Sequence, residues 1–208
     1  MPTNISAWRI ALWLAIVTVF YNVVEGVVSI AFGLSDDTLC LFGFGLDSFV
    51  EVISGIGIWH MVARIRGGGE GRDSFERTAL RVTGISFYLL SAGLVISAAL
   101  NAYHGAHPST TLSGIVISSI SIVTMIFLMR AKIKVGTQLH SDAIIADAHC
   151  TRTCVYLSVI LLLSSILFAV FKIGYIDSIG AIGIAWYAFS EGRESFEKAK
   201  GKACCCHG

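Results

Sequence analysis

Residues 8–33 read WRIALWLAIVTVFYNVVEGVVSIAFG, and this stretch holds only two charged side chains, Arg9 and Glu25. A helix needs roughly 20 mostly apolar residues to cross about 30 Å of hydrocarbon, so this stretch is long enough to span a bilayer. Five comparable stretches follow at 39–63, 79–101, 112–129, 144–171 and 173–189. The pattern predicts an all-α, polytopic membrane protein built as a bundle of six transmembrane helices.

The composition supports the same fold class. Apolar residues make up 55% of the chain and charged residues only 14%, against roughly 25% charged in soluble domains. The mean hydropathy is +0.75. The apolar runs are continuous, whereas the strands of a membrane barrel alternate in polarity. The first run is too long for the apolar part of a signal peptide, and no basic stripe with interleaved aromatics suggests nucleic-acid binding.

Lysine and arginine predict the orientation of the bundle. Thirteen of the 15 fall on one side of the predicted spans, including Arg130, Lys132 and Lys134 after the fourth. The exceptions are Lys172 on the opposite side and Arg152 inside the fifth span. Because cytoplasmic loops are enriched in Lys and Arg, we expect both termini to be cytoplasmic.

The chain is expected to have two parts. Residues 1–192 form the six-helix transmembrane domain, and residues 193–208 form a short, basic, cysteine-rich cytoplasmic tail. We expect a multi-pass integral membrane protein, in the cytoplasmic membrane if the source is prokaryotic. The cysteines are expected to be thiols, since three lie in apolar runs and three are consecutive.

Carboxylates within the predicted spans include Glu25, Asp47, Glu51 and Asp147. Each costs roughly 2.5 to 3.5 kcal/mol to insert, so each is a functional candidate. Asp47 and Glu51 are four residues apart, which places both on one helical face one turn apart. Such a pair is tolerable if a cation sits between the carboxylates, if they share protons, or if Arg152 pairs with them.

The fifth span carries a matching stripe, because Asp147, Cys150 and Cys154 follow the i, i+3, i+7 spacing of one helical face. Carboxylate oxygen from one helix and sulfur from another suit tetrahedral zinc, and sulfur favours such softer ions over Mg²⁺ or Ca²⁺. Binding would release protons from the ligands, which is the chemistry of a metal/proton antiporter. The alternative is that the two cysteines are small packing residues. The predicted metal ligands are Asp47, Glu51, Cys150 and Cys154.

Other residues are secondary candidates. Glu25, one turn after Asn22, is either a proton relay or a residue that hydrogen-bonds between helices. Asp147 is either an entrance carboxylate or a solvated group near the cytoplasmic mouth. The tail carries side chains that bind soft metals. They could capture metal loosely, they could be part of an ordinary terminus, or the cysteines could accept palmitate. These tail residues are Cys204, Cys205, Cys206 and His207.

These residues together resemble the transmembrane domain of the cation diffusion facilitator (cation efflux) family. The similarity is carried by residues 21–26 (YNVVEG), 43–51 (GFGLDSFVE) and 146–148 (ADA), and it covers nearly the whole chain. In the family, the metal is held by one pair on the second helix and one on the fifth, commonly His or Asp followed four residues later by Asp. The resemblance implies that these places fall here on Asp47 with Glu51 and on Cys150 with Cys154.

The resemblance implies proton-coupled export of a divalent metal from the cytoplasm, alternating access to a midplane site, and a homodimer. The chain departs from the family in its cysteine pair, and it resembles a short form without the C-terminal cytoplasmic domain. We therefore expect a transporter of zinc, or of cadmium or iron, with protons as counter-ions and no tightly bound cofactor. The alternative is a membrane protein that binds or senses metal without moving it. An enzyme with a cysteine nucleophile is disfavoured, because no His and carboxylate are spaced to activate the thiol.

Overall fold

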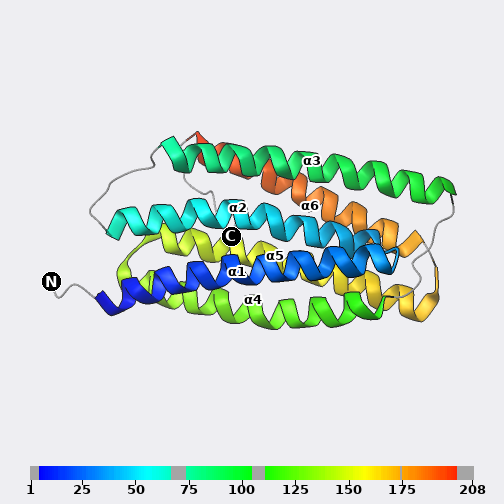
Figure 1. Ribbon diagram of the computed structural model, residues 1–208, viewed down its shortest axis with the longest axis horizontal. Helices are drawn as coiled ribbons and strands as arrows, with labels where there is room; N and C mark the ends of the chain where they lie inside the picture. Colours follow the sequence, from blue (N-terminus) through cyan, green and yellow to red (C-terminus); the bar gives the residue numbers. More distant parts are fainter. Residues whose placement is uncertain (1–4, 67–73, 105–110, 174, 201–208) are drawn as a thin grey trace.

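The computed structural model describes residues 5–66, 74–104, 111–173 and 175–200, and all of its regular structure in these ranges is helical. The elements are α1 (Ile5–Ser35), α2 (Leu39–Arg66), α3 (Ser74–His104), α4 (Leu112–Leu139), α5 (Asp142–Phe171) and α6 (Tyr175–Ala199). They lie side by side in one long bundle (Figure 1). The predicted all-α six-helix fold is confirmed.

Five of the six helices, α1 to α5, contain stretches long and apolar enough to cross a membrane. The exception is α6, whose 25 residues would extend about 37 Å. Its apolar middle is short because Asp177 lies near its start and charged residues recur from Glu191 onward. Helix α6 nevertheless packs along α3, so it belongs to the same bundle.

The outer surface of the bundle differs from that of a soluble protein. Large apolar side chains are exposed on the outside of the bundle, among them Trp13, Phe20, Leu89, Phe127 and Trp186. Hydroxyl side chains are buried inside, among them Ser29, Ser118, Ser121, Ser158 and Ser165. An apolar surface suits lipid, and small or hydroxyl residues suit close packing between membrane helices. The protein is an integral, multi-pass membrane protein.

The helices divide into two groups. Helices α1, α2, α4 and α5 pack together and are called the four-helix group, and α3 with α6 are called the α3–α6 pair. Figure 1 shows α3 and α6 together along one side of the bundle, and α6 packs on α5 as well as on α2. Since α2 contacts both members of the pair as well as α1 and α5, it connects the two groups.

The α3–α6 pair is packed through glycines and aromatic rings. A Cβ atom at Gly84 would lie 2.8 Å from the Phe196 ring, and one at Gly192 would lie 2.9 Å from the Tyr88 ring. The Tyr88 ring is 5.1 Å from that of Phe189 and 5.5 Å from that of Phe196, between centroids. The glycines therefore allow the two helices to approach closely enough for these rings to stack.

Asp177 joins the start of α6 to the start of α2. Its carboxylate accepts hydrogen bonds from the backbone N–H groups of Leu39, at 2.8 Å, and Cys40, at 3.2 Å. The first N–H groups of a helix have no partner within the helix, and a carboxylate placed there also complements the helix dipole. The side chain is 2% exposed, so this cap lies in the interior. The cap therefore holds the starts of α2 and α6 at the same height along the bundle axis.

Candidate metal centre

Helix α2 presents Asp47 and Glu51 to the interior of the bundle, as their four-residue spacing predicts. Asp47 is 2% exposed, and within the described part of the chain its Oδ1 atom has no hydrogen-bond partner. The carboxylates within Coulombic range of it are those of Glu51, Glu191 and Glu25. A buried carboxylate among others is costly unless protons or cations offset the repulsion.

Glu51 joins three helices of the four-helix group. It accepts a hydrogen bond of 3.1 Å from Asn22 Nδ2 on α1. On its other side the Sγ atom of Cys154 on α5 lies 2.7 Å from each of its carboxylate oxygens. Three residues predicted from separate sequence motifs, Asn22, Glu51 and Cys154, therefore meet at one place.

The contact between Cys154 and Glu51 indicates where a proton is held. Two ligands on one tetrahedral zinc are about 3.5 Å apart, from bonds of roughly 2.3 Å to sulfur and 2.0 Å to oxygen. The sulfur and the carboxylate oxygens are closer than this, so in this conformation the thiol donates a hydrogen bond to Glu51. A cation that bound both groups would have to displace that proton and separate the two side chains slightly.

Glu25 lies beside these residues on α1. Its Oε2 atom accepts a hydrogen bond of 3.1 Å from Ser48 Oγ on α2, and its Oε1 atom has no partner among the described residues. Asn22 Oδ1 is likewise buried without a described partner. Because carbonyl and carboxylate oxygens accept protons or bind cations, these atoms form a polar interior beside Asp47.

Part of the predicted site lies outside the described residues. This holds for the side chains of Asp147 and Cys150 on α5, and for the tail residues Cys204, Cys205, Cys206 and His207. Among the side chains that are described, no three of His, Cys, Asp or Glu form a ready-made metal-binding group. Three of the four predicted ligands are therefore described, namely Asp47, Glu51 and Cys154, and Cys154 is a thiol rather than half of a disulfide.

Lys132 lies inside the bundle, whereas the sequence predicts it beyond the end of the fourth span. It was expected at the cytoplasmic edge, but α4 continues to Leu139 and Lys132 is only 1% exposed. Its Nζ atom donates a 2.9 Å hydrogen bond to Thr151 Oγ1 on α5 and lies within Coulombic range of Glu51. The spacing of the buried residues Met125, Leu128 and Lys132 places all three on one helical face, which is the signal that could have identified it.

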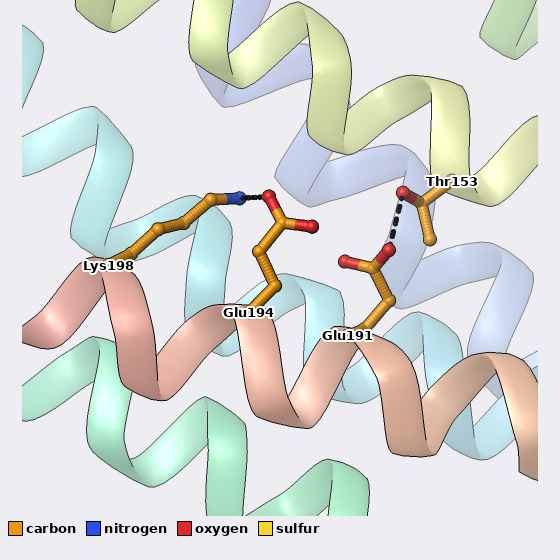
Figure 2. Close-up of polar contacts among 4 residues, drawn as sticks. All are labelled: Thr153, Glu191, Glu194 and Lys198. Carbon is orange, nitrogen blue, oxygen red and sulfur yellow. Dashed lines mark hydrogen bonds and ion pairs between the residues drawn. The ribbon is translucent and has the colours of Figure 1, made fainter. Parts of the chain in front are cut away.

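Glu191 is a second residue that the sequence did not single out, because it follows the last apolar run. It accepts a 3.2 Å hydrogen bond from Thr153 Oγ1 on α5. Figure 2 shows Glu191, Glu194 and Lys198 projecting from the side of α6 that faces Thr153. Lys198 Nζ is 2.8 Å from Glu194 Oε1.

One turn of α5, residues 151–154, thus contacts three charged residues from three helices. It binds Lys132 of α4, Glu191 of α6 and Glu51 of α2. Arg152 in the same turn is exposed, and no described ion pair joins it to Asp47 or Glu51. The carboxylate pair on α2 therefore meets a buried lysine and a thiol rather than an arginine.

The chain is similar to a known family of membrane proteins. The family model described as the cation efflux transmembrane domain matches residues 12–200, which is nearly the whole chain. The matched region includes Asp47, Glu51, Cys150 and Cys154. A comparison with curated proteins found no significant match.

Proposed function

Because the chain belongs to the cation efflux family of membrane cation transporters, we propose that it exports a divalent transition metal such as Zn²⁺ in exchange for protons. Family membership makes the chain a cation transporter. The metal, the proton coupling and the ligands below are our proposal. We further propose alternating access of a homodimer, following the resemblance stated above.

The proposed ligands are Asp47 and Glu51 on α2 with Cys150 and Cys154 on α5. The observation that carries this assignment is the direct contact between Glu51 and Cys154, which brings α2 and α5 together at the predicted residues. Two oxygens and two sulfurs suit tetrahedral zinc and disfavour Mg²⁺, which prefers six oxygens. Cadmium and iron remain possible substrates of the same ligand set.

We propose that proton exchange takes place at the same contact between Glu51 and Cys154. The Cys154 thiol donates to Glu51, so a metal that takes both groups releases the thiol proton. With all four ligands ionised the site would carry four negative charges against two on the metal. When the metal leaves, protons returning to the ligands would replace its positive charge. The nearby ammonium of Lys132 would offset part of the remaining negative charge. Glu25 and Asn22 are proposed as the relay for these protons, and Asp147 as an entrance carboxylate.

The test is uptake of zinc, cadmium and ferrous ions into sealed proteoliposomes with an imposed proton gradient. The native chain is compared with Asp47→Asn and with the double variant Cys150→Ser/Cys154→Ser. Asp37→Asn, an exposed carboxylate between α1 and α2, serves as the matched control. Proton-dependent flux lost in the first two variants and kept in the control supports the proposal.

Two other results would overturn parts of it. Stoichiometric metal binding without flux would indicate a protein that binds or senses metal. Native flux in both site variants would show that the cation passes elsewhere in the bundle.

A further inference from the structure

Glu191 is an interior-facing carboxylate on α6 that the proposed site does not use. It is held by Thr153, the residue next to the proposed ligand Cys154. It is also within Coulombic range of Asp47, whose buried Oδ1 atom has no described partner. Glu191 therefore belongs electrostatically with the carboxylates of α2, although it comes from a different group of helices.

Its level along the bundle follows from the cap at Asp177, which holds the starts of α2 and α6 together. At 1.5 Å per residue, Asp47 lies about 12 Å beyond Leu39, the first residue of α2. Glu191 lies about 21 Å beyond Asp177 on α6. Glu191 is thus about 9 Å closer than Asp47 to the end of the bundle at which α6 ends, an end that the distribution of Lys and Arg assigns to the cytoplasm.

Charged groups continue from Glu191 to that end. Glu194 lies one turn further along the same side of α6, and it pairs with Lys198 at 2.8 Å (Figure 2). The Glu194 side chain is 47% exposed, so it is accessible from outside the bundle. A cation moving inward from this end would meet Glu194, then Glu191, then Asp47.

We propose that Glu191 is a transit site, at which the transported divalent cation is bound between the end of α6 and the deeper ligand Asp47. The inference rests on the proposed function, since it presumes that a metal reaches Asp47. The Thr153 hydroxyl donates its hydrogen to Glu191 and keeps its lone pairs. Carboxylate and hydroxyl oxygen together suit a cation that retains part of its hydration shell, which is weaker binding than at the sulfur-containing site.

The experiment compares Glu191→Gln with Glu197→Gln in oriented proteoliposomes, with Zn²⁺ supplied from either side. Glu197 is the matched control, because it lies on the same helix, is 45% exposed and pairs only loosely with Arg193 at 3.6 Å. We expect Glu191→Gln to raise KM about 10-fold for zinc offered from the side where α6 ends. Loss of a residue that supports metal ligands usually costs about 10- to 100-fold, and the lower value is expected here. Its kcat, and equilibrium zinc binding to purified protein, should stay near native. Glu197→Gln should change none of these.

Two results would overturn the inference. A native KM from both sides would show that the cation does not use Glu191, and a KM raised equally from both sides would make Glu191 a structural residue. Glu191→Asp, which keeps the carboxylate, should restore part of the side-specific effect and covers the case in which the glutamine variant folds poorly. Asp47→Asn is measured in parallel, because its loss of equilibrium zinc binding tests the proposed function independently of Glu191.

Discussion

The two groups of helices are packed with different chemistry. The α3–α6 pair is held by stacked rings and close backbones, with Tyr88 and Phe196 set against Gly192 and Gly84. The four-helix group is held by polar contacts. Examples are the hydrogen bond of Ser158 to Ser121, at 2.9 Å, and that of Ser48 to Glu25, at 3.1 Å.

This difference indicates that the two groups of helices have different roles. Lipid offers no hydrophobic drive for helix association, so close van der Waals contact must hold the α3–α6 pair, and such contact fits only one geometry. Polar contacts can be exchanged for protons, water or a metal at small net cost, since both states are satisfied. The four-helix group is therefore suited to handling a cation. The α3–α6 pair is suited to act as a scaffold, apart from Glu191 on the side of α6 that faces α5.

The largest expected effect is on transport through the polar interior. Glu51→Gln removes a charge and a proposed ligand but keeps the shape of the side chain. We expect zinc flux in proteoliposomes to fall more than about 100-fold, because loss of even an outer-shell partner usually costs about 10- to 100-fold. The melting temperature in detergent should not fall, since a buried amide is less costly than a buried carboxylate. Flux within twofold of native would show that the polar interior of the four-helix group is structural only.

The second effect is on the scaffold. Gly192→Ala places a Cβ atom 2.9 Å from the Tyr88 ring and 3.2 Å from the carbonyl oxygen of Gly84. Overpacking of this kind typically costs about 1 to 3 kcal/mol, which thermal unfolding in detergent would detect as a lower melting temperature. Flux per folded molecule should remain close to native. The control is Gly93→Ala on α3, where a Cβ meets nothing within 4 Å and stability should be unchanged or slightly higher.

A smaller effect is expected where the two groups are joined. Asp177→Ala removes the cap on the first N–H groups of α2, and loss of an N-cap typically costs about 0.5 to 2 kcal/mol. Asp177→Asn should cost less, because its amide oxygen still accepts a hydrogen bond. Thermal unfolding compares both with Asp37→Asn, an exposed acid near the same end whose left-handed backbone, with a φ of 54°, tolerates asparagine. Equal stability of the alanine variant and the control would mean that α2 and α6 are aligned by other contacts.

The sequence predicted what depends on local pattern. Apolar runs identified the helices, and the four-residue spacing of Asp47 and Glu51 placed both on the interior face of α2. The sequence also predicted Glu51 and Cys154 as ligands of one metal site, and the two side chains are in contact, while the metal site itself stays a prediction. The spacing within one helix is set by its geometry, so these predictions needed no knowledge of tertiary contacts.

Residues whose role depends on distant partners were not found in this way. Asp177 caps a helix that begins 138 positions earlier in the chain. The sequence places Lys132 at the cytoplasmic edge because basic residues cluster there. Helix α4 instead continues past Lys132 to Leu139. Glu191 resembled a surface acid following an apolar run, and only its contact with Thr153 places it beside the α2 carboxylates. Such roles are set by the packing of helices, which periodicity does not specify.

The smallest effect expected is from a single hydroxyl in the four-helix group. Ser158 is fully buried, donates its hydroxyl hydrogen to the Cys154 carbonyl at 2.7 Å and accepts a hydrogen bond from the Ser121 hydroxyl at 2.9 Å. Hydrogen bonds between membrane helices average about 0.6 kcal/mol, so Ser158→Ala should lower stability by about that amount and change flux less than twofold. Ser119→Ala is the control, because that hydroxyl is exposed and bonds only within its own helix. If Ser158→Ala destabilised the protein as much as Gly192→Ala, the polar interface would be as tightly specified as the α3–α6 pair, and the contrast between a scaffold and an adaptable ion-handling interior would not hold.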